Sequence, residues 1–291
     1  MPASARASAY IVGAFEHPTR HAPDKSLAQL HAEVALGALR DAGLAKEDID
    51  GYFCAGDVPG WEAPGVGPFS IIDYMGLRLR HLDTTESWGS SYINHVAHAA
   101  DAIAAGRCRV ALITLAGRPR AEGMATGTRV VARGNAPELA FEAPYRPTVT
   151  TMYAMVAARH MHEFGTTPEQ LAWVKVAASQ HAQWNPQAML PEPVTVAQVL
   201  ASPMIADPLH RLDCCVISDG GGALIVAAPE IARELDRPRV AVRGFGFAPK
   251  HLDGGRIDIT TSAARWSGAR AFAMAGLRPA DIKYVSVYDS F

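Results

Sequence analysis

Residues 38–49 read ALRDAGLAKEDI, and residues 271–282 read AFAMAGLRPADI. The second segment begins 233 positions after the first, and six of the twelve aligned pairs are identical. In each segment a glycine follows a helical pattern and an apolar residue leads toward a further strand. Helix ends in Ala-Gly-Leu also arise by convergence. The shared order of strand, helix, glycine and strand nevertheless favours two copies of one α/β unit.

The first copy is predicted to extend from residue 9 to residue 54. Residues 9–15 are apolar enough for a buried strand, and residues 49–54 form a second candidate. Between them, apolar residues recur at helical spacing from Ser26, which suits the N-cap position, to Gly43 at the helix stop. The three elements together have about the length of a βαβ unit.

The second copy repeats this order later in the chain. Residues 240–246 match the first strand in character, with Gly244 in the place of Gly13, and residues 284–288 are predicted to form the strand after the helix. The sequence then reaches Phe291 without counterparts of the elements that follow the first copy. We therefore expect the C-terminal half to be incomplete here, by roughly a hundred residues, which is a domain-sized piece.

Several elements are predicted after the first copy. A segment rich in Gly and Pro over residues 56–68 precedes a long helix over residues 90–105 and a strand over residues 109–115. Another strand is predicted over residues 224–227, after a turn over the glycine-rich residues 219–222.

The long segment 117–213 is read as an insertion. It is rich in Pro and Arg, and it contains predicted helices around residues 152–164 and 168–182. Because it is too long for a loop, it is predicted to form a lid or subdomain over a site. The predicted domains are therefore 1–236, which includes this insertion, and 237–291, the start of a truncated second domain.

Composition excludes several classes of protein. With 291 residues, 49% hydrophobic and 19% charged residues and a net charge of -2, the chain is typical of a globular protein and not of a nucleic-acid-coating one. No run reaches transmembrane length, and the N-terminus lacks a secretory apolar region. The four cysteines form no CxxC pair, so a reducing, cytoplasmic location is predicted.

Two common kinds of ligand site are not expected. The glycines at 220–222 precede a strand, whereas a phosphate-binding loop leads into a helix. His160 and His162 are two residues apart and face apart on a helix, and His95 and His98 lack the glutamate of an HExxH motif. No metal is therefore predicted.

The helix predicted to start near residue 90 has chemical interest at its N-terminus. Residues 86–106 read ESWGSSYINHVAHAADAIAAG, a turn of small residues that leads into a tightly packed helix. Free backbone N–H groups at such an end can stabilise an oxyanion. Ser90 and Ser91 are most simply N-caps, because no base lies at a recognisable spacing for a nucleophilic serine.

Four features in combination resemble the thiolase superfamily. They are the duplicated unit, the helix end DAIAAG at residues 101–106, the segment RLDCCVISDG at 211–220, and YDSF at 288–291. The branch they resemble is that of the sterol-carrier, or non-specific lipid-transfer, thiolases. The resemblance covers nearly the whole chain. It implies a duplicated α/β fold of αβαβα layers, a homodimer, and an acyl-CoA substrate covered by the inserted loop domain.

The first departure from this family is Gly89. Family thiolases carry a Cys-x-Ser-Gly motif at the helix start, and counting back from Gly106 places Gly89 where the cysteine belongs. That cysteine carries the acyl group as a thiolate, which glycine cannot do. Cys54 and Cys108 are predicted to lie on or beside strands elsewhere. A shift of one residue in the count would put Trp88 or Ser90 at this position, and Ser90 would reopen acyl transfer.

The second departure is Tyr288. Lipid-transfer thiolases have His-Asp-Cys-Phe where this chain has Tyr-Asp-Ser-Phe. A tyrosine at a strand end is by itself ordinary packing, but its place in the family motif favours a catalytic role. A chain that lacks the cysteine and has tyrosine in place of this histidine resembles the thiolase-like steroid side-chain aldolases. These cleave β-hydroxyacyl-CoA thioesters by a retro-aldol step and often pair with a small OB-fold acyl-CoA-binding partner.

Retro-aldol chemistry is compatible with both departures. It needs a base for the β-hydroxyl proton, donors for the thioester enolate and an acid that protonates it, but no acyl-enzyme. Tyr288 is predicted to relay a proton, which requires neighbours that lower its pKa from about 10. The backbone N–H groups of Gly89, Ser90 and Ser91 are predicted to hold the enolate oxygen, and glycine at 89 leaves room for a bulky substrate.

The leading expectation is therefore an acyl-CoA aldolase of thiolase fold, with coenzyme A as part of the substrate and no other cofactor. The alternatives are an acetyl-CoA C-acyltransferase and a non-catalytic acyl-CoA- or lipid-binding subunit. Expected partners are a second copy of the chain and a small OB-fold acyl-CoA-binding protein, with no nucleic acid and no membrane. The resemblance places the family's Gly-His-Pro histidine and late cysteine, or their replacements, beyond Phe291. The chain alone is expected to be inactive unless another polypeptide supplies them.

Overall fold

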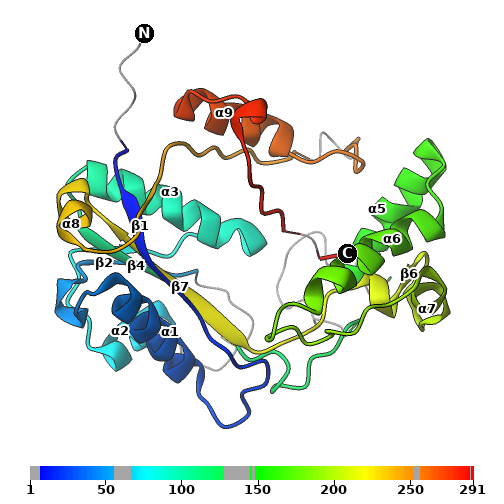
Figure 1. The fold of residues 1–291 in the computed structure, drawn as a ribbon, viewed down its shortest axis with the longest axis horizontal. Coiled ribbons are helices and arrows are strands. Elements are labelled where there is room, and N and C mark those ends of the chain that lie inside the picture. The colour runs from blue at the N-terminus through cyan, green and yellow to red at the C-terminus, as the bar shows by residue number, and fades with distance from the viewer. Residues whose placement is uncertain (1–6, 56–66, 128–144, 146–147, 252–255, 289) are drawn as a thin grey trace. The chain divides into compact units, whose positions relative to one another are not determined.

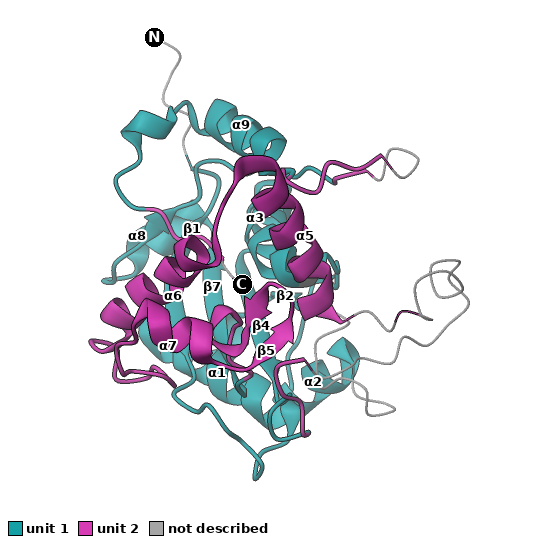
Figure 2. Cartoon of the chain, turned by 90° about the vertical axis from the view of Figure 1, so that its right-hand side faces the viewer, with its two compact units in different colours: residues 1–122, 218–249, 263–284 teal, residues 123–217, 250–262, 285–291 magenta. Residues whose placement is uncertain are grey.

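The structure is a computed structural model that describes residues 7–55, 67–127, 145, 148–251, 256–288 and 290–291. Most of the predicted Gly/Pro-rich segment 56–68 lies outside these residues. The chain forms two compact units, shown in Figure 2. Unit 1 consists of residues 1–122, 218–249 and 263–284, and unit 2 of residues 123–217, 250–262 and 285–291. Each unit has a hydrophobic core of its own.

Unit 1 is built on a mixed sheet with the strand order β3-β2-β4-β7-β1-β8 (Figure 1). The strands are β1 (Tyr10–Glu16), β2 (Gly51–Phe53), β3 (His81–Asp83), β4 (Val110–Gly117), β7 (Gly220–Ala227) and β8 (Val240–Ala241). β2 is parallel to β3 and β4, whereas β7 is antiparallel to β4 and β1. β1 and β2 therefore point the same way, as expected for a βαβ unit, but β4 and β7 lie between them.

Helices cover both faces of this sheet. They are α1 (Leu27–Ala42) and α2 (Pro68–Met75) on one face and α3 (Ser91–Ala104) on the other. Successive strand residues point to opposite faces. On β2, Tyr52 therefore packs in the core beneath α1, and its neighbour Phe53 packs in the core beneath α3. Both side chains are fully buried, so the short strand β2 joins the two layers.

The first copy of the repeat is confirmed. The Ser26 hydroxyl caps α1 by accepting the N–H of Gln29 at 3.1 Å. Gly43 ends the helix in the left-handed region, with φ 71°. The turn that follows is closed by the Asp48 carboxylate, which accepts the N–H of Ala45 at 2.8 Å. Each of these residues takes the role at a helix end or turn that its residue type favours.

The second copy reproduces these details around α9 (Ala264–Ala275), which follows α8 (Pro229–Glu234) and β8. Gly276 ends α9 with φ 65°. The Asp281 carboxylate accepts the N–H of Arg278 at 2.8 Å, as Asp48 does in the first copy. The equal helix stop and the equal turn confirm that the matched segments are two versions of one unit.

The approach of strand to helix is also repeated. A Cβ added at Gly13 would lie 2.4 Å from the Ala38 carbonyl oxygen, and one added at Gly244 would lie 2.4 Å from the Ala271 carbonyl oxygen. Ala38 and Ala271 are themselves aligned in the sequence repeat. Both glycines are needed because the strand backbone touches the helix at the same point in each copy.

Two strand predictions and one turn prediction need correction. Of the predicted strand 240–246, only Val240–Ala241 pairs, with β1, and residues 284–288 form no strand. The backbone of residues 284–288 has no strand beside it among the described residues, and a strand is stable only when a neighbour satisfies its N–H and C=O groups. The predicted turn over 219–222 is largely strand, because Gly220–Gly222 begin β7. A Cβ at Gly221 would lie 2.2 Å from the Leu115 carbonyl oxygen, so the glycines serve close pairing with β4.

Unit 2 contains the helices predicted for the insertion. They are α5 (Val149–Phe164), α6 (Pro168–Ala182) and the shorter α7 (Val196–Ala201), followed by the hairpin of β5 (Met204–Ala206) and β6 (Leu209–His210). Each helix has a threonine N-cap, at Thr148, Thr167 and Thr195, whose side chain accepts a backbone N–H three residues on. Among the described residues, neither unit has a helix with the length and apolar character needed to span a membrane.

Candidate active site

The start of α3 is shaped by a one-turn 3₁₀ helix, Trp88–Ser90, which leads directly into Ser91. Gly89 and Ser90 are exposed, whereas Ser91 is completely buried. The predicted group Gly89, Ser90 and Ser91 is thus a continuous backbone segment at a helix N-terminus. The positive end of the helix dipole lies here, so developing negative charge is stabilised.

The serine hydroxyls stabilise this turn, although not as the predicted N-caps. Ser90 is at the N-cap position, but its hydroxyl donates to the Ser87 carbonyl oxygen at 2.8 Å and makes no cap bond. Ser91 Oγ accepts the Ser87 N–H at 2.8 Å and donates to Glu86 Oε1 at 2.9 Å. Asn94 donates to Ser87 Oγ at 2.6 Å. The 3₁₀ turn keeps Ser90 in a helical conformation, whereas a capping residue is usually extended.

A second polar network attaches α3 to the end of β3. His98 Nδ1 lies 2.8 Å from Asp83 Oδ2, and the Thr85 hydroxyl and N–H donate to Asp83 Oδ1. Burial alone would raise the pKa of Asp83, but the bonds from Thr85 and His98 outweigh it and lower the pKa. His95 Nε2 donates to the Thr85 carbonyl oxygen at 2.9 Å, and burial lowers the His95 pKa, which favours the neutral ring. These bonds fix the loop that carries Glu86.

No cysteine provides an activated nucleophile at this turn. All four are free, and Cys54 and Cys108 are buried beside β2 and β4, as predicted. Burial raises the pKa of each of these two thiols to about 11. The negative charge of Glu86 adds to the rise at Cys54. A buried thiol with so high a pKa remains protonated near neutral pH and is a poor acyl acceptor.

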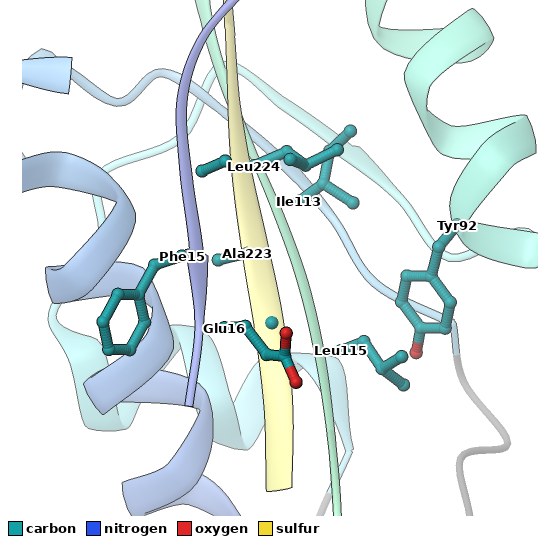
Figure 3. A pocket seen from close by; sticks show the side chains of 9 residues that line it. Phe15, Glu16, Tyr92, Ile113, Leu115, Ala223 and Leu224 are labelled. Atoms are coloured by element: carbon teal, nitrogen blue, oxygen red, sulfur yellow. The ribbon is translucent and has the colours of Figure 1, made fainter. Parts of the chain in front are cut away.

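A cavity of about 400 Å³ opens beside the first turn of α3, on the sheet of unit 1 (Figure 3). Tyr92 from α3 and Leu115 from β4 lie on one side of it, and Phe15 from β1 lies on the other. Ile113 and Leu224 add apolar surface. The lining is largely apolar, with the Glu16 carboxylate as its charged group, and its volume suits a medium-sized apolar ligand.

Tyr288, the other predicted catalytic residue, belongs to unit 2. Its side chain is 80% exposed and its backbone is not in a strand. The structure therefore does not bring it together with Gly89 into one described site, and its catalytic role stays a prediction. Of the rest of the YDSF motif, Asp289 lies outside the described residues. The Ser290 carbonyl oxygen accepts the Cys215 N–H at 2.9 Å. The Phe291 ring stacks on the Tyr153 ring, with 4.4 Å between the ring centroids.

The described residues contain no group of three or more His, Cys, Asp or Glu side chains that could hold a metal ion. His95 and His98 bond instead to Thr85 and Asp83, which are neighbours in the loop after β3. Glu86 is not among the site residues predicted from the sequence, although it begins the segment 86–106 that contains them. The signal that could have identified it is a carboxylate three residues before Gly89.

Comparison with known proteins agrees with this architecture. A family model described as thiolase C-terminal domain-like matches residues 250–291. The acetyl-CoA acetyltransferase of Methanothermobacter thermautotrophicus is 36% identical over 275 residues, which cover 92% of this chain and 70% of that protein. The chain belongs to the thiolase superfamily. Its members include enzymes, and the thiolase-like α/β fold predicted from the sequence is confirmed.

Two further thiolase-superfamily relatives identify the branch. The steroid side-chain-cleaving aldolase of Thermomonospora curvata is 30% identical over 284 residues, covering 92% of this chain and 70% of that protein. The solved structure of the Ltp2-ChsH2(DUF35) aldolase superposes with a TM-score of 0.81 at 31% identity, covering 94% of this chain and 71% of that chain. These similarities confirm the predicted branch of the superfamily.

Proposed function

We propose that this thiolase-superfamily member cleaves a β-hydroxyacyl-CoA by a retro-aldol reaction. The observation that carries the proposal is Gly89 at the start of α3, where no thiol stands; Cys54 and Cys108 are buried beside strands and have raised pKa values. A Claisen-type thiolase reaction requires a nucleophile that accepts the acyl group, and a retro-aldol reaction does not. The aldolase relatives from T. curvata and in the Ltp2-ChsH2 structure support the same choice.

The start of α3 and the cavity beside it have complementary roles in this proposal. The Gly89 N–H and the positive end of the α3 dipole are proposed to face the negative charge that develops on the thioester oxygen as the enolate forms. The other two predicted N–H groups do not contribute in this conformation, because the Ser90 N–H donates to the Ser87 carbonyl oxygen at 3.4 Å and Ser91 is fully buried. The adjacent cavity receives the apolar acyl group, which we propose to be as bulky as a steroid side chain with part of its ring system. Glycine at 89 leaves space where a side chain would otherwise stand between the two.

The remaining requirements concern protons and partners. Tyr288 is proposed to return a proton to the enolate carbon, which requires it to reach the substrate in the assembled enzyme. The CoA moiety enters as part of the substrate, and no other cofactor takes part in the proposed reaction. A homodimer and a small acyl-CoA-binding subunit are the proposed partners in the cytoplasm, and the two-component aldolase structure supports the second of these.

The test is to incubate the full-length protein, alone and with its partner, with a β-hydroxyacyl-CoA. The expected products are a ketone or aldehyde and a shortened acyl-CoA, detected by mass spectrometry. Condensation of acetyl-CoA with an acyl-CoA, without release of a carbonyl product from the β-hydroxy substrate, would contradict the proposal. Tight thioester binding without turnover would instead indicate a non-catalytic binding subunit.

The second candidate is an acetyl-CoA C-acyltransferase, which the similarity to the M. thermautotrophicus acetyltransferase favours. Ser90 is the residue to examine, because it is exposed beside Gly89. Its hydroxyl, however, donates to Ser87 and has no described base within hydrogen-bond distance. An acyl adduct on Ser90 or on a cysteine would support this candidate, and if the adduct is on Ser90 the Ser90→Ala variant should be inactive.

A further inference from the structure

The proposed reaction needs a base for the β-hydroxyl proton, and neither Gly89 nor the serines provide one. We propose that the Glu86 carboxylate is this base and is therefore a catalytic residue. The inference rests on the proposed function, since it assigns the first proton transfer of that reaction. It adds a residue that lies three positions before Gly89 on the same turn.

The position of Glu86 is fixed by a buried partner. Ser91 is fully buried, and its hydroxyl accepts the Ser87 N–H at 2.8 Å. This bond uses the hydroxyl as an acceptor and directs its proton to Glu86 Oε1, which lies 2.9 Å away. The carboxylate is thus oriented by an interior group, while Glu86 itself is exposed at the turn. An oriented but accessible carboxylate is what general base catalysis requires.

The other titratable groups around this turn are less suited to the task. Asp83 is engaged by Thr85 and His98, and these bonds stabilise its charged form and make it a weaker base. His95 is fully buried, so it cannot contact a substrate. Cys54 is also fully buried, and burial raises its pKa to about 11. Glu86 therefore combines an exposed carboxylate with an orientation fixed by the Ser91 hydroxyl.

The proton and electron balance of the step is simple. Glu86 removes the proton from the β-hydroxyl group, and the electron pair of that O–H bond forms the carbonyl of the released ketone or aldehyde. The bond between the α and β carbons breaks, and its electron pair passes into the thioester as an enolate, which the Gly89 N–H and the α3 dipole stabilise. Protonation of the α carbon then gives the shortened acyl-CoA, and no oxidant or reductant is consumed.

The test compares Glu86→Gln with Glu47→Gln in the full-length protein with its partner. Glu47 is an exposed glutamate of unit 1 near α1, so its variant is a matched control. Glu86→Gln keeps the shape and can still accept the Ser91 hydrogen bond, but it cannot take a proton. We expect cleavage to fall by a factor of roughly 10² to 10⁴, with binding of a non-cleavable acyl-CoA unchanged and Glu47→Gln at the wild-type rate.

The outcomes separate this inference from the proposed function. If the wild type cleaves the β-hydroxyacyl-CoA and Glu86→Gln cleaves it within threefold of that rate, Glu86 is not the base and the proposed function stands. If the wild type itself does not cleave, the proposed function fails first. Should Glu86→Gln lose its fold or its ligand binding, Glu86→Asp decides, because a shorter carboxylate should keep measurable cleavage. An Asp variant that folds, binds and is no more active than the Gln variant would overturn the assignment.

Discussion

The two copies of the repeat share their local structure and differ in what surrounds it. α1 and α9 end in the same left-handed glycine, and Gly13 and Gly244 approach the two helices at the same point. α1 contributes Leu30 and other side chains to a large core, whereas α9 has no buried residue. In the first copy the following strand is β2; in the second the equivalent residues 284–288 are unpaired and exposed.

The comparison separates local from tertiary causes of structure. Caps, glycine stops and aspartate-closed turns form in both copies, because each is made by residues that are close in sequence. In the first copy β2 pairs with β4 and β1 pairs with β7, whereas in the second copy only Val240–Ala241 pair, with β1. If this is correct, equivalent substitutions should have unequal effects in the two copies, and the difference should follow burial.

The largest difference is expected for the paired glycines. Gly13→Val would place a Cβ 2.4 Å from the Ala38 oxygen and 2.8 Å from the Ala42 Cβ, inside a closed core. It should lower the free energy of unfolding by about 3 kcal/mol, as overpacking of a buried site does. Gly244→Val makes the same clash with Ala271, but α9 can move away, so about 1 kcal/mol or less is expected. Urea denaturation of both variants measures the two changes in the free energy of unfolding. Equal losses of stability in Gly13→Val and Gly244→Val would contradict the expected difference between the copies.

The second difference is a dependence of stability on pH that only the first copy should confer. His31 is fully buried in α1, and its Nδ1 lies 2.8 Å from the Thr114 hydroxyl; the aligned residue in α9 is Ala264. Burial lowers the pKa of His31 to about 3. The unfolded chain therefore binds a proton below pH ~6.5 that the folded chain does not, and stability falls with decreasing pH, by about 1.4 kcal/mol per unit at most.

The measurement is urea denaturation of the wild type and His31→Gln at pH 7 and pH 4.5. The wild type should lose about 2 to 3 kcal/mol more than the variant between these values, since glutamine does not titrate. Hydrogen exchange should assign the acid sensitivity to α1 and not to α9. A variant with the same pH dependence as the wild type would show that other groups, such as buried carboxylates, dominate.

The same division explains how much of the molecule could be predicted from sequence. Ser26, Gly43 and the helical periodicity between them predict α1 to within one residue, because these signals act over one or two turns. The strand predicted over residues 284–288 is wrong because strand formation depends on a neighbour that sequence patterns do not show. The turn predicted over residues 219–222 is wrong for a related reason: its glycines permit close approach of β4, which only the pairing reveals.

The candidate site shows the same limits. The importance of Gly89–Ser91 could be predicted from a small-residue turn before a helix. The roles of the hydroxyls could not, because Ser91 reaches back to Ser87 and Glu86 through a turn whose geometry the sequence does not specify. The catalytic role predicted for Tyr288 depends on family resemblance, since its side chain is exposed in unit 2 and no described contact tests it.

A smaller effect is expected for the link between strand and helix end. In the first copy the Asp41 carboxylate accepts the Ala14 N–H at 2.9 Å, and the aligned residue in α9 is Met274. Asp41→Ala should cost about 0.5 to 1 kcal/mol, because a charged hydrogen bond is lost but an acidic group is also removed from a helix C-terminus. Met274→Ala, at a half-exposed position, should change stability by less than about 0.5 kcal/mol. Thermal denaturation of both variants tests whether Asp41→Ala loses more stability than Met274→Ala. A larger loss of stability in Met274→Ala would contradict this prediction.

The smallest effect concerns the N-caps of the two helices. Ser26 is extended, with ψ 160°, and its side chain caps α1, so Ser26→Ala should cost about 1 kcal/mol. Ala263 occupies the same place before α9, but its ψ is -5°, a helical conformation from which a serine hydroxyl does not readily reach the N–H three residues on. Ala263→Ser should therefore stabilise α9 by no more than a few tenths of a kcal/mol, as measured by amide exchange in its first turn. A gain as large as the loss in Ser26→Ala would mean that the start of α9 can become extended, and the two copies would then be closer in local structure than their present caps indicate.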